Sequence, residues 1–245
     1  MSPDSIPLRP IDEAECRTCG AGAPVDEHFC PNCSRFLALG RHGDYFSFLG
    51  LPRQLNLDSE QLERNFRELS RKFHPDYYYN APPQERLASL ERSSYLNDAY
   101  RALKNPVSRI EHLLALEGFP PVASDRPGPS GQAPAKVPPA LLEEVFALNE
   151  ELDEIREARE GGANPDALRQ RLEAARQPID RKREQHEARL QSLSAQWDAE
   201  RDSAPPERRR ATLDALQAML LERNYINNLI AAIEREAAGI VSHDS

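Results

Sequence analysis

Apolar residues recur at steps of three and four along most of this 245-residue chain, and this spacing constrains the fold more than any other feature. Such spacing places apolar side chains on one face of a helix. Runs of β-branched residues, which an extensive sheet requires, are scarce. The chain contains 21 prolines and 11 glycines. The sequence therefore predicts a mainly α-helical protein made of several small, separately folded units.

The four cysteines lie in one short segment, "CRTCGAGAPVDEHFCPNC". They form two Cys-x-x-Cys pairs, Cys16 with Cys19 and Cys30 with Cys33. Two residues between the thiolates let each pair fold as a tight knuckle that presents both sulfurs to one cation. Because four thiolate ligands leave no open position for water, the spacing predicts a closed, structural zinc site within residues 14–36.

Other uses of the four cysteines have to be weighed. Two disulfides would need an oxidising compartment, and a redox dithiol motif would need a βαβ pattern that neither pair has around it. Iron is compatible with the same sulfur ligands, and His28 is close enough in sequence to replace one cysteine. We expect zinc on four cysteines, in a segment that forms a small unit of its own.

A helix is expected to begin near Asp58 or Ser59, both good N-caps, and to end at His74, because Pro75 disfavours helical backbone at the preceding residue. Its two faces differ in character. The apolar stripe consists of Leu62, Phe66, Leu69 and Phe73, and the opposite face carries Arg64, Arg67 and Arg71, with Lys72 nearby.

A second helix, from about residue 84 to residue 103, should pack antiparallel to the first, and a short helix over residues 106–116 should follow. The tip of this hairpin then exposes His74, Pro75 and Asp76. A histidine beside an aspartate could act as a general base or as half of a metal site. No partnered nucleophile or second acidic cluster accompanies the pair, so we expect a loop that another protein recognises.

The stretch "RKFHPDYYY", the cationic helix that contains its start, and "NDAYRAL" on the next helix resemble a J-domain, the module of DnaJ-type co-chaperones. The resemblance covers residues 43–118. It implies that the loop and the basic helix dock on a DnaK-type chaperone and stimulate its ATP hydrolysis. The chaperone-binding residues that it implies are His74, Pro75, Asp76, Arg64, Arg67, Arg71 and Lys72.

Residues 119–139 are rich in Pro, Gly, Ser and Ala and predict a linker. Beyond it, breaks at "GGANPD" and "SAPPE" separate helices over about 140–160, 165–202 and 206–238, which should form a three-helix bundle within residues 140–240. The expected seam consists of Leu141, Val145, Leu148, Leu152 and Ile155, then Leu168, Leu172, Ala175, Ile179, Leu190, Leu193 and Trp197, then Leu213, Leu216, Leu220, Ile226, Ile230 and Ile233.

Some apolar residues fall outside these seams. Leu142 and Phe146 form an adjoining row on the first helix of the bundle, and Leu221, Tyr225 and Leu229 form one on the third. Such rows could widen the core or bind a partner. We favour a partner surface, because a small bundle needs only one buried face on each helix.

The stretches "YFSFLGLP", "NPVSRIEHLLALEGF" and "LLEEVFALNEELDEI" resemble the HscB family over residues 43–238, and "FCPNC" resembles the N-terminal extension of its eukaryotic members. The resemblance implies a co-chaperone for iron–sulfur cluster assembly that binds an IscU-type scaffold and delivers it to an HscA-type chaperone. Glu143 and Ala147 differ from the residues usual in the family, and the linker is longer. The scaffold-binding residues implied are Leu142, Phe146, Glu150 and Tyr225.

Charge and targeting features narrow the function classes. With a formal net charge of −9, the chain should not be attracted to nucleic acid over long range. No apolar run is long enough to span a bilayer, the N-terminus lacks a secretory signal layout, and its acidic residues do not fit a mitochondrial transit segment. We therefore expect a cytoplasmic co-chaperone that performs no chemistry itself. The alternatives are a J-domain co-chaperone with another client and a zinc-knuckle regulator.

Overall fold

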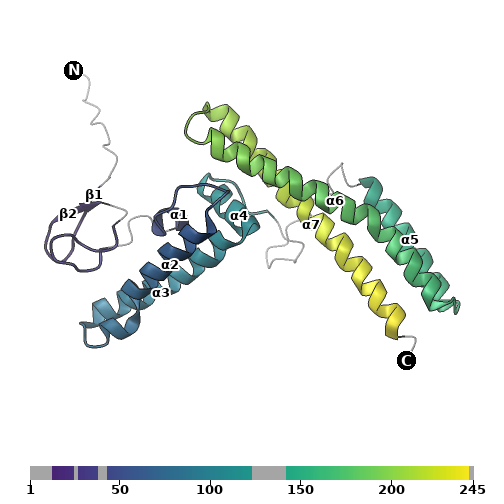
Figure 1. The fold of residues 1–245 in the computed structure, drawn as a ribbon, viewed down its shortest axis with the longest axis horizontal. Coiled ribbons are helices and arrows are strands. Elements are labelled where there is room, and N and C mark those ends of the chain that lie inside the picture. Colours follow the sequence, from purple (N-terminus) through teal and green to yellow (C-terminus); the bar gives the residue numbers. More distant parts are fainter. Residues whose placement is uncertain (1–12, 25–26, 38–42, 123–141, 243–245) are drawn as a thin grey trace, which may run out of the picture. The chain divides into compact units, whose positions relative to one another are not determined.

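A computed structural model describes residues 13–24, 27–37, 43–122 and 142–242. The chain divides into two compact units, Met1–Gly118 and Phe119–Ser245. Figure 1 shows that helices make up most of both units, so the mainly α-helical fold expected from the apolar spacing is confirmed. In the ranges described, no helix combines the length and the apolar character needed to cross a membrane.

The cysteine segment contains two short strands. β1 (Glu13–Glu15) and β2 (Gly22–Pro24) pair antiparallel. An isolated bridge joins Phe29 to Phe36 farther along the segment. Each pairing closes the chain around one Cys-x-x-Cys stretch, the strands around the first and the bridge around the second. The segment belongs to the same compact unit as the helices that follow it.

The first helix of this unit is fixed by its N-cap. In α1 (Tyr45–Phe48), the buried carboxylate of Asp44 accepts hydrogen bonds from the backbone N–H groups of Phe46 (3.0 Å) and Ser47 (3.2 Å). Arg53 pairs with the same carboxylate at 2.9 Å. This arrangement satisfies both the helix terminus and the buried charge.

The longer α2 (Ser59–Phe73) begins and ends where the sequence predicts. Asp58 caps it by accepting from the backbone N–H of Glu60 (2.9 Å), and the helix stops before His74. Its predicted apolar stripe faces the interior: Phe66 is half-buried and stacks on Tyr100 with ring centroids 4.1 Å apart, and the others are buried. Those buried members are Leu62, Leu69 and Phe73.

Two more helices complete the unit, α3 (Pro83–Lys104) and α4 (Pro106–Leu116). The C-terminal end of α2 contacts the N-terminal half of α3, and the middle of α2 contacts the C-terminal half of α3, so the two are antiparallel as expected. The buried side chain of Arg109 in α4 donates to the carbonyl of Leu103 (2.6 Å) and to that of Leu55, which ties α4 to the preceding segments.

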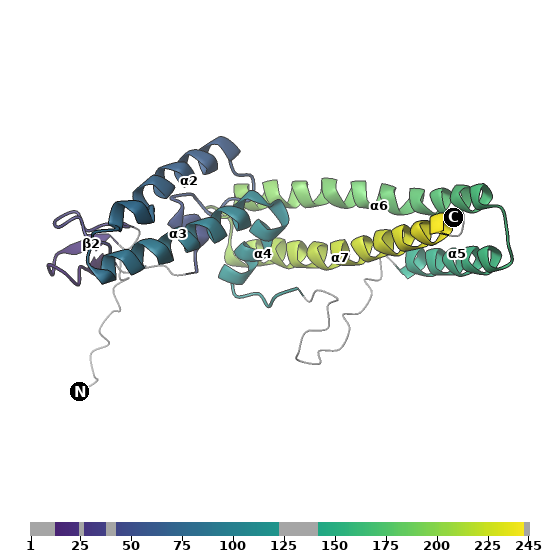
Figure 2. The same cartoon turned by 90° about the horizontal axis from the view of Figure 1, so that it is seen from below.

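The second unit is a bundle of α5 (Leu142–Glu160), α6 (Pro165–Glu200) and α7 (Pro206–Ser242). Each of the three helices contacts the other two. Figure 2 shows that the shorter α5 lies beside only one end of the long α6–α7 pair. α6 continues as a helix through Pro178.

The predicted seam forms most of the bundle core. Every described seam residue is buried except four that are half-buried, Val145, Ala175, Leu193 and Ile230, and Leu141 lies outside the described residues. The start of the expected linker also contacts this unit: Phe119 lies under the guanidinium of Arg210 at 3.7 Å, and Gln217 donates to the carbonyl of Pro120 at 3.0 Å.

Buried polar side chains in the bundle were not expected from the apolar spacing. Glu236 is buried in α7 and accepts hydrogen bonds from two arginines of α5, Arg156 (2.8 Å) and Arg159. His186 of α6 is also buried, with Nε2 2.8 Å from the carbonyl of Met219 in α7. These contacts set the register of the helices in addition to the apolar seam.

His112, another histidine without a predicted role, joins α4 to α1. Its Nε2 accepts a hydrogen bond from the backbone N–H of Tyr45 (3.0 Å), and its ring stacks on that of Tyr45 with centroids 4.3 Å apart. Burial lowers the pKa of His112; nearby Arg53 lowers it further, while Asp44 opposes the shift. The folded state therefore favours the neutral imidazole.

We expect this histidine to make the first unit less stable in mild acid. A lowered pKa means that the unfolded chain binds the proton first, so the stabilisation is present above about pH 6.5 and is lost as the pH falls through that value toward the lower folded pKa. In urea unfolding followed by circular dichroism at pH 7, 6 and 5, His112→Gln should be less stable by about 1 kcal/mol at pH 7 and should depend less on pH than the original chain. Equal pH dependence of the two proteins would show that His112 does not titrate on unfolding.

Candidate functional sites

The His-Pro-Asp loop lies where α2 ends. His74 leaves the helix with φ −59° and ψ 126°, and Pro75 starts a short 3₁₀ turn, η1 (Pro75–Tyr78). The backbone N–H of Asp76 donates to Nδ1 of His74 at 3.3 Å. Both side chains are exposed, that of Asp76 to 86%. The turn therefore presents a histidine and an aspartate side by side to solvent.

Contacts on both sides hold this loop. The carbonyl of Phe73 accepts from the hydroxyls of Ser89 (2.7 Å) and Ser93 (2.9 Å), both in α3. After the tripeptide, the hydroxyl of Tyr78 donates to the carbonyl of Lys72 at 3.0 Å. The last carbonyl groups of α2 thus receive side-chain donors in place of the missing helical N–H groups. A loop with fixed ends and exposed polar side chains suits recognition.

The four predicted docking cations, Arg64, Arg67, Arg71 and Lys72, are exposed on α2. The sequence interpretation of a cationic face is incomplete, because acidic residues pair with Arg64, Arg67 and Lys72. Glu63 pairs with Arg67, and Glu68 pairs with Lys72 at 2.7 Å. The hydrogen bond from Lys72, together with its charge, lowers the pKa of Glu68. Arg64 pairs with Glu60 at 3.7 Å and Asp58 at 3.9 Å.

On the bundle, three of the four predicted scaffold residues share one face of α5. Leu142, Phe146 and Glu150 follow one another at steps of four and are exposed. Phe146 is 70% exposed, which is high for a phenylalanine. Core residues such as Leu148 and Leu152 lie on the opposite side of the helix. The row on α5 is therefore a surface feature.

The corresponding row on α7 differs from the expectation. Leu229 is buried, and Tyr225 is half-buried and packs against the core of the bundle. Leu229 widens the core, so the interpretation of the row as a partner surface is wrong for this residue, while the half-buried Tyr225 remains a predicted contact. Leu229 is buried because it packs in a core cluster with residues of both α5 and α6.

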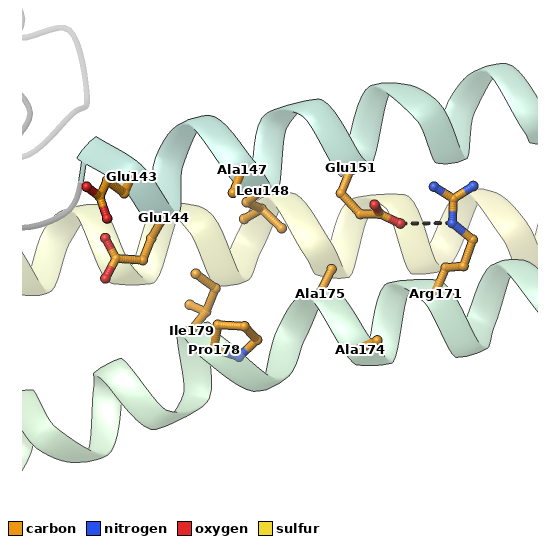
Figure 3. A pocket seen from close by; sticks show the side chains of 10 residues that line it. All are labelled: Glu143, Glu144, Ala147, Leu148, Glu151, Arg171, Ala174, Ala175, Pro178 and Ile179. Carbon is orange, nitrogen blue, oxygen red and sulfur yellow. Dashed lines mark hydrogen bonds and ion pairs between the residues drawn. The ribbon is translucent and has the colours of Figure 1, made fainter.

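Glu143 and Ala147 line a groove between α5 and α6 (Figure 3). The groove has a volume of about 560 Å³, and its other lining residues come from both helices. Figure 3 shows Glu151 directed at Arg171, with Oε1 and Nε 2.9 Å apart. The remaining lining residues are Glu144, Leu148, Ala174, Ala175, Pro178 and Ile179.

The two Cys-x-x-Cys stretches fold as matching knuckles. In the first, the carbonyl of Cys16 accepts from the N–H of Gly20, and in the second, that of Cys30 accepts from Ser34, both at 2.8 Å. Gly20 has φ +73° and Ser34 has φ +57°. Ser34 thus has a left-handed backbone conformation. Gly20 has the same conformation at the equivalent position of the first knuckle, where a glycine adopts it without backbone strain.

The four cysteines are free thiols, and their sulfurs all lie within 4.8 Å of one another. The sulfurs of Cys16 and Cys33 are 3.7 Å apart, and those of Cys19 and Cys30 are 3.6 Å apart. Zinc–sulfur bonds of about 2.3 Å in a tetrahedron place sulfurs roughly 3.8 Å apart, so this cluster fits a metal ion of that kind. The backbone N–H of Ala21 and the side chain of Asn32 lower the pKa of Cys19 to about 6, whereas burial and the hydrogen bonds with the other cysteines raise the pKa of Cys33.

His28 is not part of the cluster. Its Nε2 lies 3.1 Å from the carbonyl of Phe48, and its ring packs edge-on against Phe48 and Phe73. The expectation that the cysteine segment forms a unit of its own is therefore wrong: the segment packs on the helices, and both belong to one compact unit. No local pattern predicted this contact, because the aromatic residues of the cysteine segment are also typical of a small independent core.

Residues 44–112 match the family model of the DnaJ domain. The fold of the chain is similar to the crystal structure of human co-chaperone protein HscB, with 23% identity and a TM-score of 0.60, covering 91% of this chain and 98% of that one. It is also similar to chaperone HscB from Vibrio cholerae, with 28% identity and a TM-score of 0.50, covering 78% of this chain and 96% of that one.

The exposed tripeptide at the tip of the α2–α3 hairpin and the family match define residues 44–112 as a DnaJ domain. The bundle that follows extends the likeness beyond that domain. As a whole, the chain has the fold of the HscB co-chaperones, as the sequence resemblance implied.

The cysteine cluster predicts about one tightly bound metal ion per chain, measurable by elemental mass spectrometry of the purified protein. Because a serine hydroxyl is a poor ligand for a soft cation, Cys33→Ser should lower metal affinity at least about ten-fold in competition with a chelator. A serine variant at exposed Thr18, which contributes no ligand, is the matched control. If the protein holds no metal and shows no free thiols until a reductant is added, the cysteines form disulfides and the metal site is wrong.

Proposed function

We propose that this chain is an HscB-type co-chaperone that couples a DnaK- or HscA-type chaperone to an IscU-type scaffold for iron–sulfur clusters. The observation that carries the proposal is the exposed His74-Pro75-Asp76 turn, anchored at the tip of the α2–α3 hairpin of a DnaJ domain. The chain itself performs no chemistry in this proposal. It stimulates ATP hydrolysis in its partner by binding.

The docking surface on the chaperone side consists of the loop and the exposed cations of α2. Their ion pairs lie at the surface, where such a pair contributes at most about 1 kcal/mol to stability. Arg67 and Lys72 can therefore exchange Glu63 and Glu68 for acidic groups of a partner at little cost. Their charges would steer the encounter, and the tripeptide would supply specificity.

On the scaffold side, the exposed row of α5 is the proposed contact. Phe146 offers a large apolar anchor, Leu142 extends it by one turn, and Glu150 adds charge at the edge. Anchors of this kind at the centre of an interface carry much of the binding free energy. Tyr225 of α7, half-buried against the bundle core, is proposed as a further scaffold contact.

The metal proposed for the cysteine cluster is zinc, held by Cys16, Cys19, Cys30 and Cys33. Bound there, it would serve as a structural ion, because all four ligand positions are filled by sulfur. Reduced thiols fit a cytoplasmic location, which we propose on this ground.

His74→Gln should reduce stimulation of the chaperone ATPase at least about ten-fold, because the imidazole is exposed and is a recognition group. The measurement is single-turnover ATP hydrolysis by a DnaK- or HscA-type chaperone with increasing co-chaperone. Arg101→Ala, an exposed cation on α3 outside the docking surface, is the control and should stimulate normally. Full stimulation by His74→Gln would contradict the docking role.

Phe146→Ala should weaken binding to a purified IscU-type scaffold about ten-fold or more in calorimetry, and leave the unfolding temperature unchanged, because the ring is exposed. Tyr225→Ala should lower the unfolding temperature, since its ring packs on the core. If the original chain does not bind the scaffold while its DnaJ domain stimulates the chaperone, the client is a different protein.

A further inference from the structure

The surface of the cysteine segment that packs on the helices is aromatic. The rings of His28, Phe29 and Phe36 lie 5.0, 5.9 and 6.1 Å from the ring of Phe73, measured between centroids. We call these three residues the aromatic face. Phe73 is fully buried and immediately precedes His74. The aromatic face therefore encloses the side chain on which the His-Pro-Asp loop begins.

The same face reaches the far side of the loop. The ring of Phe36 lies 4.9 Å from that of Tyr78, the last residue of η1. Tyr78 follows Asp76 by two residues and is bonded back to Lys72. A single ring, Phe36, thus contacts the residue before the tripeptide and a residue shortly after it.

A buried arginine secures this contact. Arg92 of α3 is only 4% exposed, its guanidinium lies 4.6 Å from the centroid of Phe36, and it donates to the carbonyl of Leu37. Within the described part of the chain it makes no ion pair. A desolvated cation held by an aromatic ring and a carbonyl interacts strongly with both. Nearby, Arg35 and Glu85 form a weaker link at 3.8 Å.

The position of the aromatic face depends on the second knuckle. Phe29 directly precedes Cys30, and Phe36 follows Cys33 by three residues. The bridge between Phe29 and Phe36, and the hydrogen bond from the N–H of Cys30 to the carbonyl of Arg35 (2.8 Å), close the knuckle between them. The two phenylalanines can hold their places only while the knuckle keeps its shape.

We infer that the second cysteine knuckle positions the His-Pro-Asp loop, and that Phe36 and Arg92 are the positioning residues that transmit its conformation. With the knuckle folded, Phe73 and Tyr78 are fixed on either side of the tripeptide, and few conformations are open to it. Loss of the metal or of Phe36 frees the loop while the α2–α3 hairpin persists. The consequence for the chaperone rests on the proposed function, but the positioning itself does not.

Amide hydrogen exchange in the full-length protein, measured by NMR, tests the positioning. The N–H groups of Asp76, Tyr77 and Tyr79 all bond within the loop. Phe36→Ala should accelerate their exchange about five-fold or more. Phe36→Leu, which keeps apolar volume against Phe73, should restore protection. Arg17→Ala, an exposed residue of the first knuckle, is the matched control and should change nothing.

Two results would overturn the inference: unchanged exchange at these amides in folded Phe36→Ala, or an equal acceleration throughout α3, which would indicate general destabilisation. If Phe36→Ala does not fold, removal of the metal from the original chain by a chelator tests the role of the knuckle independently. Chelation should accelerate the same amides. Loop amides that keep their protection after the metal is released would reject the role of the knuckle.

The ATPase assay then tests the consequence. Phe36→Ala should lower maximal stimulation about three-fold or more while the half-saturating concentration changes less than about two-fold, because the cations of α2 that steer binding are untouched. Phe36→Leu should recover stimulation. If the original chain stimulates no chaperone, the proposed function is contradicted. The exchange data would still decide whether the knuckle positions the loop. Equal losses in Phe36→Ala and Arg17→Ala would overturn that role.

Discussion

The first unit depends on how the chain leaves α2 at Phe73. Pro75 prevents the helix from continuing, and the carbonyl groups of its last turn lie close to the core, where they need donors. Two serine hydroxyls of α3 reach the carbonyl of Phe73, and its ring is enclosed by aromatic residues of the cysteine segment. Because residue 73 is fixed in backbone and side chain, the exposed His74 and Asp76 project from a defined position. The His-Pro-Asp loop is thus held in place by contacts of its buried neighbours.

Charge on α2, the proposed docking helix, shows how a helix can carry exposed cations without being destabilised by their repulsion. Pairs one turn apart, such as Glu68 with Lys72, neutralise like charges along the exposed face. They are weak because water and salt screen them, so the helix remains stable and its cations remain available. The acidic partners could have been read from the sequence by the four-residue spacing. Counting only basic residues overlooked them.

In the bundle, a second apolar row is buried where neighbouring helices cover that part of the helix, and it is exposed where they do not. α7 packs along α6 and against α5, so Leu229 and Tyr225 of its second row join the core. α5 is shorter and lies at one side of the long pair, as Figure 2 shows, which leaves Phe146 in solvent. Helical periodicity predicted both rows equally well. Only the arrangement of the neighbouring helices distinguished a wider core from an exposed surface.

Local rules explain what the sequence by itself determined: the helices and their ends, the paired cysteines, and the loop that Pro75 imposes after α2. Each depends on residues within a few positions of one another. The tertiary structure decided how the cysteine segment packs on the loop, and which polar groups are buried, among them Arg92, Arg109, His186 and Glu236. The spacing of apolar residues predicts which face of a helix is buried. The residues that cover this face are distant in sequence, and so are the carbonyl groups and rings that contact a buried charged side chain. Their meeting depends on packing of the whole unit, which no local pattern specifies.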